Sequence, residues 1–224
     1  MVFHFDENNS FCISLDSSID RWSRMQKRFD YFNMRVSQWK ACDKEVDIVA
    51  PFGNFLSFPQ KACAQSHINI YKMMRETKME YALVLEDDAC FDIDWINKLN
   101  KIHDNDDSSS GFSKDRDWHA IFLNASEPIH PKEKWVLCKE QYLTAGYIIS
   151  LNGANFILNY FENCFYSSDW MTSRMQHNGH CYSFFPWLII QEGKESNIGS
   201  QHKEDRKKVE DCLNEISYSL DNYL

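Results

Sequence analysis

An apolar run that ends in three carboxylates constrains this chain more than any other segment. Residues 81–88 read Tyr-Ala-Leu-Val-Leu-Glu-Asp-Asp. The apolar residues 82–85 predict a buried β-strand, so Glu86, Asp87 and Asp88 emerge together at its end. Because strand side chains alternate between faces, we expect Glu86 and Asp88 on one side and Asp87 on the other.

Two carboxylates that lie close together repel each other, and a shared divalent cation relieves that repulsion. Carboxylate oxygens suit a hard ion, Mg²⁺ or Mn²⁺, better than they suit Zn²⁺. The alternative is a solvated acidic turn that follows a strand and binds no ion. The spacing alone does not decide between a metal site and a turn.

The composition predicts one packed globular protein. Of the 224 residues, 43% are hydrophobic and 15% are aromatic, which argues against a disordered chain. The net charge of −9 disfavours a broad basic surface for nucleic acid. Eight scattered cysteines without a CxxC pair suit a reducing compartment. With no signal-peptide pattern and no apolar run of membrane-spanning length, we expect a cytoplasmic protein without a transmembrane segment.

Strand and helix patterns alternate along the chain. Strands are expected at 11–15, 36–41, 81–85, 118–123, 147–150, 182–185 and 188–190, with helices around 22–32, 63–74, 95–102, 156–160 and 168–179. Pro59 is expected to open the second helix and Asn152 to cap the fourth. This alternation predicts an α/β fold with a mainly parallel sheet, in which ligands collect at the carboxyl ends of the strands. Asp16 and the triplet 86–88 both fall at such ends.

Two further segments stand out by composition. Residues 103–111 are polar and predict a flexible loop within a main domain that spans 1–200. In the tail, 201–224, Val209, Leu213, Ile216 and Leu220 recur at helical spacing and predict an amphipathic helix that docks on the core. The alternative is a helix that contacts a protein partner, including a second copy of the chain.

Cys63 and His67 lie four residues apart in the second predicted helix, a spacing that a pair of metal ligands can have. No second pair completes a site in the sequence, so a core contact is the favoured interpretation.

Five motifs resemble glycosyltransferase family 25, the lipopolysaccharide-modifying and procollagen galactosyltransferases. In chain order they are Ile13-Ser14-Leu15-Asp16 with Asp20-Arg21, Ala62-Cys63-Ala64-Gln65-Ser66-His67, Leu83-Val84-Leu85-Glu86-Asp87-Asp88-Ala89, Thr144-Ala145-Gly146-Tyr147 leading to Gly153-Ala154, and Ser168-Asp169-Trp170 followed by residues 186–196. The Leu-Glu-Asp-Asp strand with an upstream Ser-His is the most specific part. The tail, 201–224, falls outside the resemblance.

The resemblance implies a GT-A fold and the transfer of a hexose, galactose or glucose, from a UDP-linked donor to an acceptor hydroxyl. It implies Mn²⁺ or Mg²⁺ held against the donor diphosphate by Asp88 directly, and by Glu86 directly or through water. Asp87 would contact the ribose or the donor sugar. The expected partners are therefore a nucleotide sugar and a glycan or other glycosylatable acceptor, with no nucleic acid.

The resemblance also implies residues that surround the donor. Asp16 and Arg21 would lie near the nucleotide, Ser66 would make a polar contact, and Thr144 and Gln191 would complete the substrate site. For Arg21 the alternative is an ordinary surface arginine on the first helix.

Asp169 is the candidate general base for an inverting displacement, which must remove the acceptor proton. Its alternative is a carboxylate that only stabilises the start of a helix. Two rival functions stay open: a non-catalytic, glycosyltransferase-like binding module, and a metal-dependent phosphotransferase. The chain lacks the phosphate-binding loop that would favour the second of these.

Overall fold

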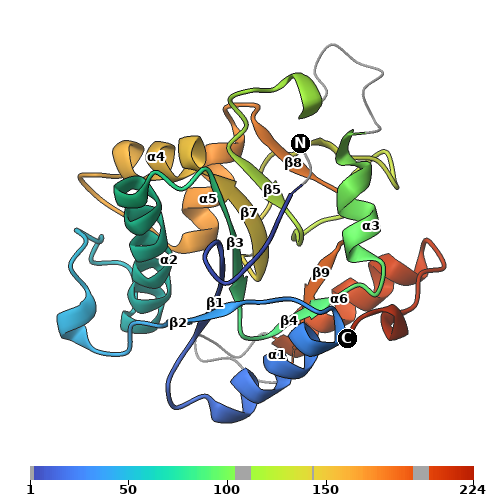
Figure 1. The fold of residues 1–224 in the computed structure, drawn as a ribbon, viewed down its shortest axis with the longest axis horizontal. Helices are drawn as coiled ribbons and strands as arrows, with labels where there is room; N and C mark the ends of the chain where they lie inside the picture. Colours follow the sequence, from blue (N-terminus) through green and yellow to red (C-terminus); the bar gives the residue numbers. More distant parts are fainter. Residues whose placement is uncertain (1–2, 104–111, 143, 194–201) are drawn as a thin grey trace.

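A seven-stranded sheet forms the centre of the computed structural model, which describes residues 3–103, 112–142, 144–193 and 202–224 (Figure 1). In spatial order its strands are β2 (Ser37–Lys40), β1 (Ser10–Ser14), β3 (Tyr81–Glu86), β7 (Gly146–Ser150), β5 (Ala120–Phe122), β8 (Cys181–Ser183) and β6 (Val136–Leu137). Strands β2, β1, β3, β5 and β8 run in one direction, and β7 and β6 run in the other. The predicted α/β class with a mainly parallel sheet is confirmed.

Helices cover both faces of this sheet (Figure 1). They are α1 (Ile19–Tyr31), α2 (Phe58–Thr77), α3 (Trp95–Asn100), α4 (Leu151–Tyr160), α5 (Ser168–Gln176) and α6 (His202–Asn214), with short 3₁₀ turns η1 (Glu45–Asp47), η2 (Lys101–His103), η3 (Phe112–Lys114) and η4 (Leu220–Asn222). Residues 104–111 of the loop predicted at 103–111 lie outside the described residues.

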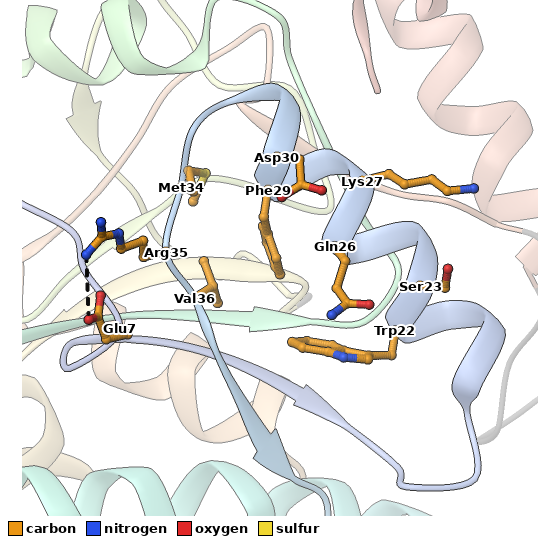
Figure 2. A pocket seen from close by; sticks show the side chains of 10 residues that line it. All are labelled: Glu7, Trp22, Ser23, Gln26, Lys27, Phe29, Asp30, Met34, Arg35 and Val36. Atoms are coloured by element: carbon orange, nitrogen blue, oxygen red, sulfur yellow. Dashed lines mark ion pairs between the residues drawn. The ribbon is translucent and has the colours of Figure 1, made fainter.

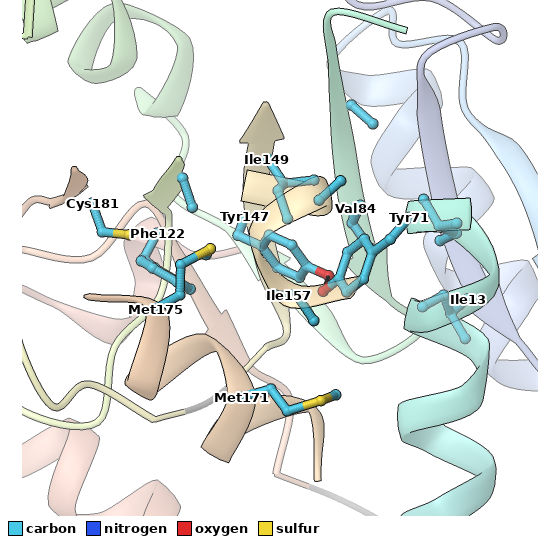
Figure 3. Close-up of a cluster of buried hydrophobic side chains, with 14 of the residues drawn as sticks. Ile13, Tyr71, Val84, Phe122, Tyr147, Ile149, Ile157, Met171, Met175 and Cys181 are labelled. Atoms are coloured by element: carbon cyan, nitrogen blue, oxygen red, sulfur yellow. Dashed lines mark hydrogen bonds between the residues drawn. The ribbon is translucent and has the colours of Figure 1, made fainter. Parts of the chain in front are cut away.

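The central strand β3 is apolar because both of its faces are covered. Ala82 and Val84 belong to a core cluster with side chains of α2, α4 and α5, part of which Figure 3 shows. Leu83 and Leu85 belong to a second cluster with side chains of α1 and α3. All four are fully buried, and burial of an aliphatic side chain of the larger kind contributes roughly 1.5–3 kcal/mol. This strand therefore presents the triplet 86–88 from a rigid base.

Side-chain hydrogen bonds from the residue before each helix fix where α2 and α4 begin. Ser57 and Gln60 bond reciprocally as a capping box at the start of α2, and Pro59 occupies its first turn, as expected. The cap predicted for α4 is wrong: Ser150, the last residue of β7, accepts the Gly153 N–H at 3.1 Å. Asn152 already lies inside the helix, because the chain turns into α4 directly from the strand.

A second, two-stranded sheet joins β4 (Ala89–Phe91) and β9 (Ile189–Gln191) in antiparallel pairing. Strand β4 follows the acidic triplet directly and was not expected from the sequence pattern. The end of the chain extends this unit: Phe91 and Leu224 exchange both backbone hydrogen bonds at 2.9 Å, and Ile93 N–H donates to Asn222 O at 2.8 Å. Residues near position 224 thus hold the strand that leaves the triplet.

The tail helix packs on the body of the protein. Leu213 is fully buried, and Val209, Ile216 and Leu220 are partly buried against the same core cluster as α2. These four apolar side chains thus pack on the core, and α6 itself ends at Asn214. A contact of the tail with a protein partner stays a prediction.

Candidate active site

The carboxyl ends of β1 and β3 lie side by side at one edge of the sheet. The two strands pair in parallel, with Ile13 opposite Glu86. Asp16 follows β1, and the triplet begins at the last residue of β3, so both follow carboxyl ends of neighbouring parallel strands. Asp87 and Asp88 already lie in the turn that leads to β4.

Arg21 binds two of the three carboxylates. Its Nη2 lies 2.5 Å from Asp87 Oδ1 and 3.3 Å from Asp88 Oδ2, and its side chain is only 12% exposed. Ser14 Oγ also donates to Asp87 Oδ2 at 2.8 Å. The surface alternative for Arg21 is therefore wrong. The expectation that Glu86 and Asp88 lie on one side and Asp87 on the other is also wrong. Asp87 and Asp88 both contact Arg21, whereas Glu86 contacts His67, because β3 ends at Glu86 and alternation does not continue through the turn.

Asp88 is the carboxylate of the triplet whose ionised form is least stabilised by its surroundings. It is 7% exposed, and its Oδ1 has no hydrogen-bond partner among the residues that the structure describes. Burial raises the pKa of Asp88 to about 7, the charge of Glu86 adds to the rise, and Arg21 opposes it. Burial raises the pKa of Asp87 as well, again opposed by Arg21. A cation near Asp88 would favour its ionised form.

Glu86 turns to the other side, toward α2. Its Oε1 accepts from Thr144 Oγ1 at 2.6 Å and lies 3.3 Å from His67 Nε2. The His67 Nδ1 atom lies 2.7 Å from the Tyr147 hydroxyl, which is 2.5 Å from the Tyr71 hydroxyl. Burial acts to raise the pKa of Glu86, but the contacts with His67 and Thr144 outweigh it and lower the pKa.

Thr144 links this network to the start of α5. Its hydroxyl lies 3.1 Å from Ser168 Oγ, which is 3.7 Å from Cys63 Sγ. Asp169 is the next residue, in the first turn of the helix, and its Oδ1 accepts the Trp170 N–H at 2.8 Å. Asp169 therefore stands beside the Glu86 network with a half-buried side chain.

The β4–β9 pair brings a later segment to the triplet. Gln191 pairs with Ala89, directly after Asp88, and Glu192 N–H donates to Asp88 O at 2.8 Å. Glu192 is a residue that the sequence analysis missed. Its carboxylate binds Arg24 and Arg28, each at 3.0 Å. The sequence contains one sign of such a partner: arginines 21, 24 and 28 recur at helical spacing in α1, and a row of partly buried guanidinium groups needs acidic partners. In the structure these partners are Asp87, Asp88 and Glu192.

Two predicted residues have contacts other than those expected. Asp16 pairs with Lys40 at 2.5 Å at the end of β2, with 59% of its side chain exposed. Ser66 is fully buried: its Oγ accepts the Cys42 N–H at 2.9 Å and donates to Ala62 O at 2.8 Å. This position suits a residue that holds the loop after β2, and it does not fit the direct ligand contact expected of Ser66.

A hollow of about 550 Å³ lies on the other side of α1, between that helix and the segment before β2 (Figure 2). Trp22, Gln26 and Asp30 line it, and Glu7 and Arg35 close one end. None of the residues predicted for the site lines this hollow, so it is separate from the triplet. Among the described residues, no helix combines the length and apolar character needed to cross a membrane.

Comparison with known proteins is consistent with this arrangement. The family model "Glycosyltransferase family 25 (LPS biosynthesis protein)" matches residues 7–172. Procollagen galactosyltransferase 1-B of Xenopus laevis is 33% identical over 116 residues, which cover 48% of this chain and 18% of that protein. Procollagen galactosyltransferase 1-A of the same species is 27% identical over 180 residues, covering 69% and 28%. A glycosyltransferase 25 family member of Aedes aegypti is 27% identical over 171 residues, covering 66% and 27%. The chain thus matches less than a third of the length of each relative.

Proposed function

We propose, from the premise that this chain belongs to glycosyltransferase family 25, that it transfers a hexose from a UDP-linked donor to an acceptor hydroxyl. The relatives named as procollagen galactosyltransferases favour galactose, with glucose as the alternative. The α/β fold is consistent with a GT-A-like enzyme, whose ligands gather at the carboxyl ends of the strands.

The observation that carries this proposal is the buried Oδ1 of Asp88, just after β3, which has no hydrogen-bond partner in the described part of the chain. An oxygen in that situation fits Mn²⁺ or Mg²⁺, because these hard ions prefer carboxylate ligands. When bound, such an ion supplies positive charge that neutralises the departing nucleoside diphosphate. Asp88 would hold the ion directly. Since His67 and Thr144 both contact Oε1 of Glu86, Oε2 is the oxygen that Glu86 offers, directly or through water.

The remaining residues would position the donor. Arg21 fixes the carboxylates of Asp87 and Asp88 relative to each other and keeps a positive charge beside the diphosphate position. Asp87 would contact the ribose or the donor sugar. Thr144 would act by orienting Glu86, and Gln191 would line the site from β9, next to the turn that carries Asp88. Asp16, exposed at the same edge, would lie at the nucleotide end.

Asp169 is the proposed general base of an inverting transfer. It lies in the first turn of α5, one residue from Ser168, whose hydroxyl contacts Thr144 of the Glu86 network. A half-buried carboxylate in that place can accept the acceptor hydroxyl proton as the new glycosidic bond forms. The acceptor itself, a glycan or a hydroxylated side chain, is best identified by mass spectrometry of candidate acceptors incubated with mixed UDP-sugars.

The direct test is hydrolysis of a panel of UDP-sugars with and without Mn²⁺. Wild type is expected to turn over one UDP-hexose in a Mn²⁺-dependent way, and Asp88→Ala should lower the rate by roughly 10²-fold or more, because a transition-state charge partner is lost. Asp117→Ala removes an exposed aspartate far from the triplet and serves as the matched control. Absence of both turnover and Mn²⁺-dependent nucleotide binding in wild type would refute the proposal.

Asp169 has a selective test. Asp169→Asn should abolish transfer to an acceptor while the affinity for UDP stays near that of wild type, since the base acts only on the acceptor proton. Normal transfer by this variant would remove Asp169 from the mechanism.

A further inference from the structure

We propose that Cys63, His67 and Glu86 form a binding site for a thiophilic divalent cation such as Zn²⁺. This site shares Glu86 with the carboxylate site around Asp88 but takes its other two ligands from α2. One ligand atom from each residue, a sulfur, an imidazole nitrogen and a carboxylate oxygen, lies within 4.8 Å of the other two. Within the described ranges, this is the one group of three His, Cys, Asp or Glu side chains that comes so close. The binding does not depend on glycosyl transfer.

The fold brings these ligands together from two elements. Cys63 and His67 are four residues apart in α2, so they lie on one face of the helix, one turn apart. That face packs against the sheet, and Glu86 ends the central strand β3 beside it. In the sequence, the Cys63–His67 pair has no third ligand nearby. In the fold, Glu86, the first acid of the triplet, provides it.

The distances are close to those that a zinc ion needs. With zinc–ligand bonds of about 2.0–2.3 Å in a tetrahedral site, ligand atoms lie roughly 3.3–3.8 Å apart. His67 Nε2 and Glu86 Oε1 are already 3.3 Å apart. Cys63 Sγ lies within 4.8 Å of both atoms, so a change in its side-chain rotation can bring it to bonding distance.

The surroundings hold the ligands in place. The Tyr147 hydroxyl binds His67 Nδ1 and is itself bonded to Tyr71, which directs Nε2 toward Glu86. Figure 3 shows the two tyrosine hydroxyls facing each other between α2 and β7. A histidine ligand whose second nitrogen is fixed in this way is the usual arrangement at metal sites. His67 is fully buried and 20% of the Glu86 side chain is exposed, so an ion or water would reach this group from the Glu86 side.

The ligand types select the ion. A thiolate and an imidazole favour Zn²⁺ or Co²⁺ over Mg²⁺ and Mn²⁺, which favour oxygen. A cation held here would also take Glu86 away from the donor site; this consequence, unlike the binding itself, rests on the proposed function.

The test is titration of the full, reduced chain with Co²⁺, a spectroscopic substitute for Zn²⁺. Wild type should bind one Co²⁺ with a thiolate-to-cobalt charge-transfer band that Zn²⁺ displaces and Mg²⁺ does not. Cys63→Ser should lose the band, and His67→Gln should weaken Co²⁺ binding by roughly tenfold or more. Cys164→Ser, which changes another partly exposed thiol, should keep both band and affinity.

Circular dichroism of each variant shows whether it remains folded. If Cys63→Ser unfolds, Glu86→Gln is the second variant, and it should also weaken Co²⁺ binding. The proposal is overturned if folded wild type shows no thiolate band, if the band persists in Cys63→Ser, or if it disappears in Cys164→Ser. Because these readouts measure cation binding and not sugar transfer, failure here and failure of the proposed function are distinguishable.

Discussion

Glu86 and Asp88 are two residues apart, yet the protein places them in opposite electrostatic surroundings. On the α2 side, His67 and Thr144 stabilise the Glu86 carboxylate in its ionised form. On the α1 side, Asp88 is buried beside Asp87 and shares one guanidinium with it, and no described residue forms a hydrogen bond to its Oδ1. One acid is therefore satisfied by the fold, and the other gains most from a ligand that the fold does not supply.

The difference shows how one strand end can serve two purposes. A satisfied carboxylate orients neighbouring groups without changing its charge. A buried carboxylate without enough partners lowers the free energy of unfolding of the free protein, and binding of a cation raises that free energy again. The predictions below test this division, beginning with the largest expected effect.

Arg21 is expected to be the strongest determinant of stability on the α1 side. Arg21→Ala leaves two buried carboxylates without their shared cation, so the free energy of unfolding should fall by roughly 3–5 kcal/mol. Urea denaturation at neutral pH measures this. The matched control is Arg35→Ala, which removes an exposed partner of Glu7 at 3.8 Å and should cost less than about 0.5 kcal/mol. Equal effects of the two substitutions would contradict the arrangement.

The two acids should also differ in the sign of their pH dependence. The folded-state pKa of Asp88, about 7, lies above its ordinary value of 3.8, so the native state holds a proton that the unfolded state has lost. Its contribution to stability is therefore lost as the pH rises from about 4 to 7, by at most about 4 kcal/mol. Asp88→Asn should gain stability relative to wild type over that interval.

Glu86 should behave in the opposite way. Because its pKa is lowered in the folded state, its contribution is fully present above the ordinary value of 4.5 and is lost as the pH falls below it. Glu86→Gln should therefore lose stability relative to wild type by a constant amount from pH 5 to 8. Urea denaturation of both variants and wild type across this range decides the matter, and parallel profiles for the two variants would show that the acids are not divided as described.

Thr144 tests the α2 side with a smaller change. Thr144→Val keeps the shape but removes the hydroxyl that donates to Glu86, which should cost about 1–3 kcal/mol and raise the pKa of Glu86. Thr144→Ser should restore both. Thr77→Val removes a hydroxyl at the exposed end of α2 and is the control. If the pKa of Glu86, followed by NMR titration, does not move in Thr144→Val, the hydrogen bond does not hold that carboxylate.

Ser66 is expected to give the smallest effect, because it lies next to His67 but faces away from both acids. Ser66→Ala leaves the Cys42 N–H without its acceptor and should cost about 1 kcal/mol, with UDP affinity unchanged within a factor of about two. Isothermal titration and urea denaturation measure the two quantities. A large loss of UDP affinity at unchanged stability would restore the direct contact that the family resemblance implies.

The position of the site was predictable from local sequence, whereas its internal contacts were not. The apolar run 82–85 predicts β3 and hence the location of the triplet, and helical spacing predicts that Cys63 and His67 share the inner face of α2. The side on which Asp87 lies depends on where the strand stops, and no local pattern distinguishes a strand that ends at Glu86 from one that ends two residues later.

Long-range pairing accounts for most of the rest. Glu192 reaches Asp88 only because β9 pairs with β4, about a hundred residues earlier, and short strands of three residues carry no recognisable period. The cap of α4 is a different case. Ser150 and Asn152 both have side chains that can cap a helix. Ser150 is the cap because β7 ends there, and residue propensities alone do not predict where that strand ends.

The backbone bonds between Phe91 and Leu224 have a consequence for synthesis on the ribosome. The chain from 1 to 191 contains both sheets and every acid of the triplet, but the turn that carries Asp87 and Asp88 leads into a strand secured by residues 218–224. In a nascent chain, the strand after this turn therefore gains these bonds only once residue 224 has emerged, later than its pairing partner β9 becomes available.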